Sequence, residues 1–334
     1  MQSPITGKEM KLEMEATKLP FRKEEFEVMY HYYVCEESGE RFTDDVLDTL
    51  NLNQVYNLYR EKYGIPFPDE IRSIREQYGV SASKMSLILG FGANQYRLYE
   101  TGEIPSVANG RLILAIKEPE DFIKQVKLSE HYLNEGEVAK IVQKAERIIQ
   151  RNNNNIWNYQ LTMQITHGES PSAYSGYCKL DFARVAKIIS YFGQAFEVNK
   201  TKLNKLLFYA DFGHYKRTGR SLTGLEYRAI QYGPVPAEYD KLYMKLQEDG
   251  LIAVSQKVVK DYTAEIFKGV VPVEEADFNG EELSVLERVR SSLGHLSTSD
   301  LVHISHEEFA WTANEKDRSL INYQDHAFHL QHFH

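Results

Sequence analysis

The chain has 334 residues, of which 42% are hydrophobic and 26% charged, a composition typical of a globular protein of about two domains. Two cysteines are too few for a disulfide framework, and the net charge of −9 excludes a protein coated in positive charge. No stretch of the sequence is apolar for long enough to span a bilayer, and residues 1–20 lack a signal-peptide core. We therefore expect a soluble cytoplasmic protein with no membrane partner.

The first 66 residues predict a small antiparallel sheet followed by a helix. Residues 11–16 alternate charged with apolar side chains, which is the period of a strand, and the run 26–34 is rich in aromatic and β-branched residues. From residue 44 to residue 64 the apolar positions follow a helical spacing instead. We therefore expect a hairpin domain over residues 1–66.

Residues 67–128 predict a domain of short helices, because glycine and proline interrupt the pattern at close intervals. The expected helices cover 69–78, 82–89, 93–100, 106–117 and 119–127.

Residues 129–177 predict a connecting segment. A helix over 137–150 leads into four consecutive asparagines, which favour neither helix nor strand and indicate a hinge at 152–155. The run 156–166 is consistent with a strand, and the Gly-, Ser- and Pro-rich stretch 168–176 with a second linker. On this basis we expect the two halves of the chain to fold separately.

Residues 178–334 predict a mainly α-helical domain, so that the whole chain is α+β and mostly helical. Segment 221–235 reads as a structured loop or short strand, and 251–259 with 265–273 as a hairpin. The expected helices are 181–191, 200–217, 238–249, 280–292 and 299–311.

Residues 80–105 have the spacing of a helix-turn-helix, in which a supporting helix, a glycine turn and a recognition helix follow one another. Asparagine and glutamine can read adenine, and arginine can read guanine or a phosphate. The side chains expected to pack inward are Met85, Leu89, Tyr96 and Tyr99. The expected DNA contacts are Ser83, Lys84, Ala93, Asn94, Gln95 and Arg97.

The alternative is an all-α bundle with ordinary polar surface residues. The charge of residues 68–128 does not distinguish the two interpretations, because this segment contains eight basic and eight acidic residues. The ending Tyr99-Glu100-x-Gly102 resembles the lambda-repressor-like helix-turn-helix superfamily. Gly90-Phe91-Gly92-Ala93-Asn94 followed by Tyr99-Glu100 resembles the MqsA-type antitoxins, and this resemblance implies binding to operator DNA. Leu98 stands where recognition helices of that type carry a basic residue, so the base preference is not carried over.

The sheet before this domain also resembles MqsA-type proteins, which carry two Cys-x-x-Cys pairs around a structural zinc. The matching positions here are Ser3, Thr6, Cys35 and Ser38. One thiolate among four residues does not hold a tetrahedral zinc, because hydroxyls are not ionised at neutral pH. We therefore expect no metal and no cofactor, with Cys178 a small buried residue. The side chains expected to hold this metal-free hairpin are Phe26, Tyr30, Tyr32 and Val34.

Residues 202–236 are the second informative segment. They contain Lys-Leu-Asn-Lys-Leu-Leu-x-x-Ala-Asp at 202–211, Thr-Gly at 218–219 and Tyr-Gly-Pro-Val at 232–235. Together with Ser-His-Glu at 305–307, these motifs resemble the Panacea (SocA-like) antitoxin domain, over about residues 181–325. The resemblance implies that residues 178–334 bind and neutralise a cognate protein toxin.

We expect the toxin contacts in the resembling segments that we interpret as exposing charged and aromatic side chains. The basic run at 200–220 also fits a solvated helix face, which is the commoner role of such a run. The expected toxin contacts are Lys202, Lys205, Tyr209, Tyr215, Lys216, Arg217 and Tyr232.

An enzyme is a further alternative, because the C-terminal half contains several titratable side chains. A hydrolase needs a nucleophile beside a base, or three metal ligands on one face, and no hydrolase motif accompanies these residues. We therefore expect no catalysis, with His306 and Trp311 bracing the core. The titratable candidates are Asp211, His214, His303, His306 and Glu307.

The last nine residues are rich in histidine. Helical spacing could place three of these imidazoles on one face and bind a transition metal weakly, but we expect a frayed terminus and assign no metal. The histidines are His326, His329, His332 and His334.

These patterns and resemblances together predict an antitoxin of a type II toxin–antitoxin system. The helix-turn-helix would bind operator DNA as a homodimer and repress the operon, and the Panacea-like domain would block the toxin. The alternative is a one-component transcriptional regulator whose C-terminal domain senses a ligand or a protein.

Overall fold

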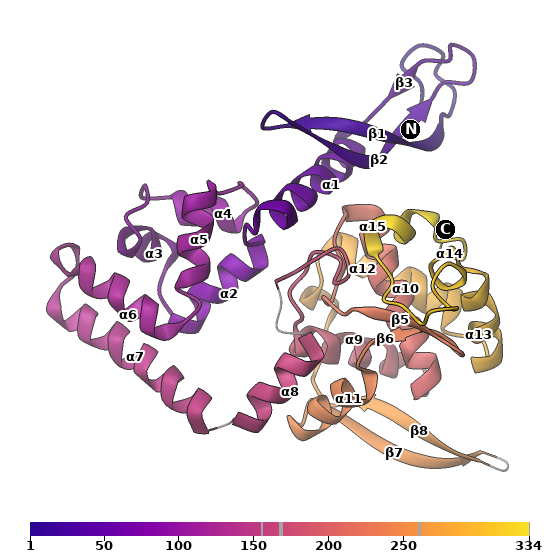
Figure 1. The fold of residues 1–334 in the computed structure, drawn as a ribbon. Helices are drawn as coiled ribbons and strands as arrows, with labels where there is room; N and C mark the ends of the chain where they lie inside the picture. The colour runs from indigo at the N-terminus through magenta and orange to yellow at the C-terminus, as the bar shows by residue number, and fades with distance from the viewer. Residues whose placement is uncertain (155, 167–169, 260–261, 334) are drawn as a thin grey trace. The chain divides into compact units, whose positions relative to one another are not determined.

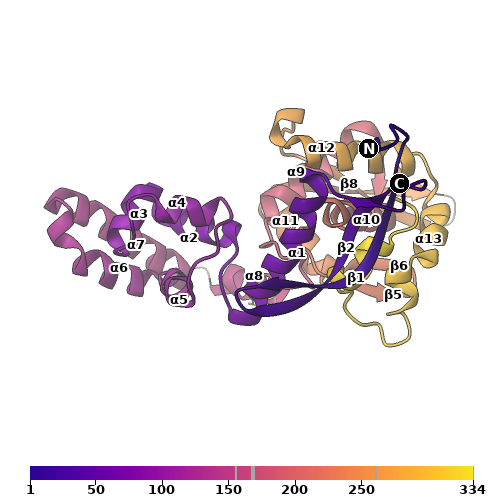
Figure 2. The same cartoon turned by 90° about the horizontal axis from the view of Figure 1, so that it is seen from above.

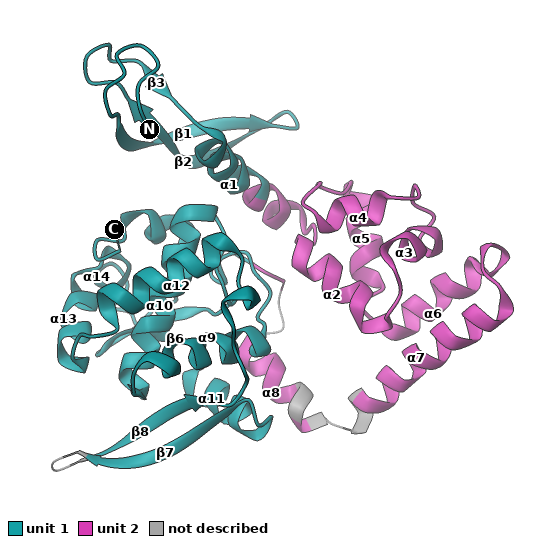
Figure 3. Ribbon diagram, turned by 180° about the vertical axis from the view of Figure 1, so that it is seen from behind, with its two compact units in different colours: residues 1–56, 172–334 teal, residues 57–171 magenta. Residues whose placement is uncertain are grey.

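The structure, a computed structural model, describes residues 1–154, 156–166, 170–259 and 262–333 (Figure 1). The fold is α+β and mostly helical, as the sequence predicts. Within the described residues, no helix is long and apolar enough to cross a membrane. Residues 1–56 and 172–334 pack as one unit, unit 1, and residues 57–171 as another, unit 2 (Figure 3). The sequence did not indicate that the N-terminal segment packs with the C-terminal one.

Unit 1 begins with an antiparallel sheet of strands β1 (Lys11–Phe21), β2 (Glu24–Val34) and β3 (Arg41–Phe42), in that order. The β1–β2 turn consists of Arg22 and Lys23, which both have positive φ angles, 46° and 70°. This backbone conformation matches the twist of a two-residue hairpin. The expected sheet is therefore confirmed.

Helix α1 (Asp45–Tyr63) covers the edge of β2 with two carboxamides. Asn51 exchanges hydrogen bonds with the backbone N–H and C=O of His31, both at 2.9 Å. Gln54 does the same with Met29, also at 2.9 Å. Each amide thus pairs with the backbone as a neighbouring strand would.

Unit 2 is helical. Its helices begin and end at the signals present in the sequence: Ser81 and Ser106 accept N-terminal backbone N–H groups of their helices, and Gly79 ends a helix in the left-handed conformation. The helices are α2 (Pro68–Tyr78), α3 (Ala82–Ile88), α4 (Gln95–Glu100), α5 (Val107–Ala115), α6 (Pro119–Leu128), the short η1 (Glu130–Tyr132), α7 (Glu135–Asn154) and α8 (Ile156–Thr166).

Two expectations for unit 2 are wrong. Residues 156–166 form helix α8 rather than a strand, and buried Leu161 and Ile165 lie four residues apart, the spacing of one helix face. Helix α7 continues through Asn154, so most of the expected hinge is helical. Asn155 lies outside the described residues.

The remainder of unit 1 surrounds helix α10, against which α12, α13 and β6 pack (Figures 1 and 2). The strands form a β4-β8-β7 sheet and a β5-β6 pair. The elements are α9 (Phe182–Ala195), β4 (Val198–Asn199), α10 (Lys200–Thr218), β5 (Tyr227–Ile230), β6 (Gly233–Pro236), α11 (Tyr239–Glu248), β7 (Ile252–Val259), β8 (Tyr262–Gly269), η2 (Glu275–Asp277), α12 (Gly280–Leu293), α13 (Thr298–Glu307), α14 (Phe309–Thr312), α15 (Tyr323–His326) and η3 (Ala327–His329).

The stretch expected as a second linker, 168–176, packs largely into unit 1 where the structure describes it, although Ser170 and Tyr174 are exposed. Ala173 is buried, the adjoining Tyr177 is fully buried, and the backbone N–H of Ser221 donates to the carbonyl of Gly176 at 2.9 Å. Residues 167–169 lie outside the described residues. From residue 172 the segment is therefore part of the core of unit 1.

The expectation of a frayed C-terminus is also wrong. Phe328, Leu330 and Phe333 are buried in unit 1. A Cβ atom at Gly213 would lie 2.6 Å from the Phe333 ring, which shows how closely this ring packs on α10. His334 lies outside the described residues.

Candidate functional site

Helix α10 is buried along its length from Lys202 to Tyr215. A helix buried on all sides is usually hydrophobic on all sides, yet this one carries charged and amide side chains. Because a buried polar group is costly unless it is hydrogen-bonded, each of these side chains needs a partner within the fold. The buried polar residues of α10 are Lys202, Asn204, Lys205, Asp211 and His214.

The two lysines bind backbone carbonyls of other segments. Lys202 donates to the carbonyls of Gly294 and Leu296 at 2.5 and 3.0 Å, and Lys205 donates to that of Pro234 at 2.9 Å. Burial lowers the pKa of both lysines, and that of Lys205 falls to about 7. The solvated basic face is therefore a wrong interpretation for these two side chains.

Asp211 holds the loop after α10 through both of its carboxylate oxygens. Oδ1 accepts the backbone N–H groups of Leu222 and Thr223, both at 2.8 Å. Oδ2 accepts the hydroxyls of Thr223 and Tyr227, at 2.6 and 2.7 Å. Burial nevertheless raises the pKa of Asp211 to about 6, against the effect of these four donors.

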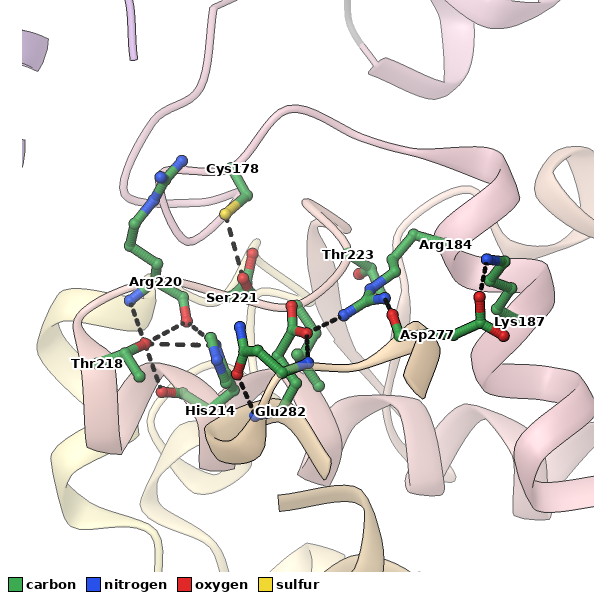
Figure 4. A network of polar contacts seen from close by, with 12 residues as sticks. Cys178, Arg184, Lys187, His214, Thr218, Arg220, Ser221, Thr223, Asp277 and Glu282 are labelled. Atoms are coloured by element: carbon green, nitrogen blue, oxygen red, sulfur yellow. Dashed lines mark hydrogen bonds and ion pairs between the residues drawn. The ribbon is translucent and has the colours of Figure 1, made fainter. Parts of the chain in front are cut away.

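A neighbouring polar network joins the end of α10 to the same loop (Figure 4). The Nδ1–H of His214 donates to the Arg220 carbonyl at 2.7 Å, and the Thr218 hydroxyl lies beside both groups. Half-buried Cys178 donates to the Ser221 carbonyl at 3.1 Å. The network thus fixes the chain path between 218 and 221.

The same network includes two cations of α9 that bind the segment before α12 (Figure 4). Arg184 donates to the carbonyl of Asp277 at 2.8 Å and also pairs with Glu282, while Lys187 pairs with the Asp277 carboxylate at 2.5 Å. These contacts attach α9 to α12.

The tyrosines of α10 also have interior partners. Tyr209 donates to buried Glu308 at 3.1 Å, and Tyr215 to Gln324 at 2.6 Å. Glu308 also accepts the backbone N–H groups of Gln331 and His332, at 2.8 and 3.0 Å. Sequence reasoning missed Glu308, although it directly follows the motif at 305–307.

Of the seven expected toxin contacts, Lys202, Lys205, Tyr209 and Tyr215 are buried. Lys216 and Arg217 are half-buried. Lys216 donates to the Leu330 carbonyl at 2.9 Å, and Arg217 pairs with Glu281 at 2.8 Å. Tyr232 differs from the other six, since 60% of it is exposed.

Tyr232 lies in the β5–β6 turn, and two aromatic residues of the following helices support that turn. Trp311 donates its indole N–H to the carbonyl of Ile230 at 2.8 Å. The His306 ring stacks on Trp311 with a centroid distance of 3.9 Å, so the pair, which we expected to brace the core, braces this turn. The turn is thus a rigid support for an exposed tyrosine.

The structure gives three of the enzyme candidates separate partners, whereas His303 and Glu307 lie beside each other. Asp211 binds the loop at 222–227, His214 binds Arg220, and His306 stacks on Trp311. Exposed His303 lies 3.5 Å from Glu307, measured between Nε2 and Oε1, and His332 also contacts this carboxylate, at 2.7 Å.

In unit 2, the helix-turn-helix residues expected to face inward are buried, as the spacing predicts: Met85, Leu89, Tyr96 and Tyr99. Tyr96 fixes α4 on α3 and α2, because its backbone N–H donates to the hydroxyl of Ser86 at 3.0 Å and its hydroxyl to the carbonyl of Ile71 at 2.8 Å.

Four of the six expected DNA contacts, Ser83, Ala93, Asn94 and Arg97, are exposed. The other two are half-buried and already have partners: Lys84 pairs with Glu137, and Gln95 donates to Glu103 at 2.8 Å. Exposed Leu98 adjoins Arg97 on the same helix.

The four positions compared with zinc ligands do converge. The hydroxyls of Ser3 and Thr6 lie 3.2 and 3.6 Å from the Cys35 sulfur. Hydrogen bonds from Ser3, Ser38 and Thr6 lower the pKa of the Cys35 thiol to about 6. One thiol with three hydroxyls does not fit zinc, and among the described side chains no three His, Cys, Asp or Glu residues are grouped to hold a metal.

Residues 203–312 match the family model of the antitoxin SocA-like Panacea domain. The matched segment runs from α10 to α14 and contains Lys205, Asp211, Tyr232 and Trp311. No curated protein and no solved structure matches the chain. The match supports an antitoxin-type role in general, while the resemblance of the N-terminal half to MqsA-type antitoxins remains a prediction.

Proposed function

We propose that this chain is the antitoxin of a type II toxin–antitoxin pair, and that the domain built around α10 binds and blocks a protein toxin. The observation that carries the proposal is the family match at residues 203–312. The internal partners of Lys205 and Asp211 support it, because they explain the motif residues as the framework of a binding domain. Binding of this kind is stoichiometric and requires no catalytic group.

The proposed toxin contact is the β5–β6 turn at Tyr232. Exposed tyrosines on a rigid support lose little conformational entropy on binding, and they contribute strongly to many protein interfaces. This proposal replaces the larger set expected from the sequence, because the four buried members of that set cannot touch a partner without unfolding α10.

The test is growth of cells that express the product of the adjoining gene together with the full-length chain. We expect wild-type chain to restore growth and to co-purify with that product, and Tyr232→Ala to weaken both. Tyr174→Ala is the matched control, because Tyr174 is 40% exposed and lies outside the matched segment. Equal rescue by wild type and Tyr232→Ala would contradict the proposed contact. A wild-type chain that fails to restore growth would contradict the antitoxin function.

We further propose that α3 and α4 bind operator DNA and repress the operon, with the chain acting as a homodimer. The support is the packing of α4 on α3, which leaves Asn94 and Arg97 exposed. A helix-turn-helix dimer reads inverted half-sites about 34–36 Å apart. A gel-shift titration against the DNA upstream of the chain's own gene tests this proposal, with scrambled DNA of equal length as the control.

The regulator alternative gives a different pattern in the same experiments. A one-component regulator binds the upstream DNA but neither restores growth nor retains the adjoining product. The antitoxin proposal requires both retention and rescue.

A further inference from the structure

Helix α7 has two chemically distinct faces. Its apolar side chains pack into the core of unit 2, where Ile141 and Ala145 are buried and Val138, Val142 and Ile148 are partly buried. This packing fixes the rotation of α7 about its axis, so the residues between these positions point to solvent.

The solvent face carries a stripe of four exposed cations, Lys140, Lys144, Arg147 and Arg151, which we call the α7 stripe. Spacings of four, three and four residues keep these side chains on one side of a helix, over about 16 Å at 1.5 Å per residue. Residues 138–151 contain one acid, Glu146, against these four bases. Among the residues that the structure describes, no carboxylate forms an ion pair with the stripe, whereas Glu137 of the same helix pairs with Lys84.

Two contacts place the first half of α7 beside α2 and α3. Glu137, one turn before the stripe begins, pairs with Lys84 of α3. The ammonium group of Lys144 lies against Gly79, where α2 ends, so closely that a Cβ atom there would collide with it. The stripe therefore begins near the N-terminal end of α3, the helix that would cross the DNA backbone in a helix-turn-helix complex.

We propose that the α7 stripe binds phosphates of the DNA backbone next to those that the N-terminal end of α3 approaches. This inference rests on the proposed DNA-binding function. Residues 68–128 carry equal numbers of acids and bases, so the helix-turn-helix itself supplies no net positive charge. DNA binding draws much of its affinity from neutralised phosphates, and the stripe supplies the missing cations.

The dimensions of the stripe agree with this partner. One DNA strand carries a phosphate about every 3.4 Å along the helix axis, so a segment of about 16 Å presents about five phosphates. Lysine and arginine side chains are long and flexible enough to reach neighbouring phosphates from fixed positions on a helix.

The test compares two charge-matched double variants of the full-length protein. Lys140→Gln/Arg147→Gln removes two stripe cations, and Lys124→Gln/Lys127→Gln removes two exposed cations from the neighbouring helix α6. Glutamine keeps the helix propensity of both sites, so we expect unchanged melting temperatures. Lys144 stays in place because of its contact with Gly79.

The measurement is affinity for duplex DNA from the chain's own upstream region, at several salt concentrations between about 50 and 200 mM. We expect the stripe variant to reduce the slope of log K against log salt by about 2 per bound chain, since each lost phosphate contact removes about 0.9. The ratio of affinities for upstream and scrambled DNA should stay unchanged, because phosphates carry no sequence information. The α6 variant should keep the wild-type slope.

The proposed phosphate contacts would be wrong if the slope of log K against log salt is unchanged in the stripe variant, or if it falls equally in the α6 variant. Neither result would contradict DNA binding by the wild-type protein. Wild-type protein with no preference for its upstream DNA would overturn the DNA-binding function and the stripe together. A stripe variant that binds DNA normally but no longer retains the adjoining gene's product would assign these cations to an acidic protein surface instead.

Discussion

The ammonium group of Lys205 lies 2.9 Å from the carbonyl oxygen of Pro234, in the solvent-free interior of unit 1. Between the two segments lies Gly233, with φ of 93°, where a Cβ atom would be 2.7 Å from the Lys205 nitrogen. The lysine of the motif at 202–211 and the glycine of the motif at 232–235 are thus two sides of one contact, each needed for the other to fit.

Lys205→Met should change how stability depends on pH. Burial lowers the pKa of Lys205 from its usual 10.5 to about 7, so between these values the unfolded chain binds more protons than the folded chain. Stability contributed by this site therefore rises as pH increases from 7 to 10.5. The variant should lose that rise, measured by urea unfolding at three pH values. Exposed Lys268→Met is the control, and an unchanged slope for Lys205→Met would contradict the prediction.

Asp211→Ala should destabilise the protein severely. It leaves two backbone N–H groups and two hydroxyls without their buried acceptor, and each such group costs about 1–3 kcal/mol, so we expect a loss of at least about 3 kcal/mol. Asp211→Asn should cost less, because its remaining oxygen still accepts from Leu222 and Thr223. Denaturant titration gives the free energy of unfolding of each variant. An equal loss for Asp211→Ala and Asp211→Asn would show that the carboxylate oxygens do not hold the loop.

The titration of the Asp211 carboxyl group should also make the folded protein less stable as pH rises to about 6. Its pKa is raised from the usual 3.8 to about 6, so the folded chain binds more protons between these values. Stability from this site is therefore greatest at the acid end of the window and declines up to pH 6. Asp211→Asn should remove the decline, which unfolding measured at pH 4, 5 and 6 can detect.

Gly213→Ala should destabilise by about 1–3 kcal/mol, the usual cost of overpacking, partly offset by the better helix propensity of alanine. The new methyl group would lie 2.6 Å from the Phe333 ring. Phe333→Leu should relieve that collision, so the double variant should be more stable than the sum of the two single changes predicts. Simple additivity in thermal unfolding would mean that the C-terminal segment is not seated on Gly213.

Ser3→Cys/Thr6→Cys/Ser38→Cys should create a zinc site around Cys35. Four thiolates about 2.3 Å from a metal match the tetrahedral structural sites of zinc proteins. The hydroxyls of Ser3 and Thr6 already lie 3.2 and 3.6 Å from the Cys35 sulfur, and the Ser38 hydroxyl also bonds to this thiol. Elemental analysis should give about one zinc per chain for the variant and well under one for wild type. Stoichiometric zinc in the wild-type protein would contradict this interpretation.

Arg97→Ala or Asn94→Ala should weaken binding to the upstream DNA by about 1–3 kcal/mol, the value of one bidentate base contact. Both side chains are exposed at the start of α4. Exposed Lys316→Ala is the control for lost charge outside unit 2. If gel shifts show wild-type affinity for both variants, the base contacts lie elsewhere.

The inward-facing residues of α3 and α4 could be predicted because their pattern is local. Met85 and Leu89 are one helical turn apart, as are Tyr96 and Tyr99, and all four are buried. The strands β1 and β2 could be predicted for the same reason, since alternation along each strand determines its faces.

The burial of α10 could not be predicted from such patterns, because its polar residues are satisfied by distant segments. Tyr209 binds Glu308 across 99 positions, and Lys202 binds Gly294 across 92. No residue within one or two helical turns of α10 indicates these partners. The sequence pattern alone therefore predicts that Lys202 and Lys205 lie on a solvent-exposed face. The C-terminal histidine-rich run has the same explanation, since its anchors are Glu308 and Gly213.

The grouping of residues 1–56 with 172–334 has a consequence for synthesis. A ribosome makes the chain from its N-terminus, so residues 57–171 emerge whole while the hairpin and the amide-bearing part of α1 still lack most of their unit. His31 meets the Phe328 ring, and Gln54 meets Gln324, only after nearly the entire chain has been translated. The helical insert therefore has the earlier opportunity to fold, and the segments that flank it in the sequence complete their packing last.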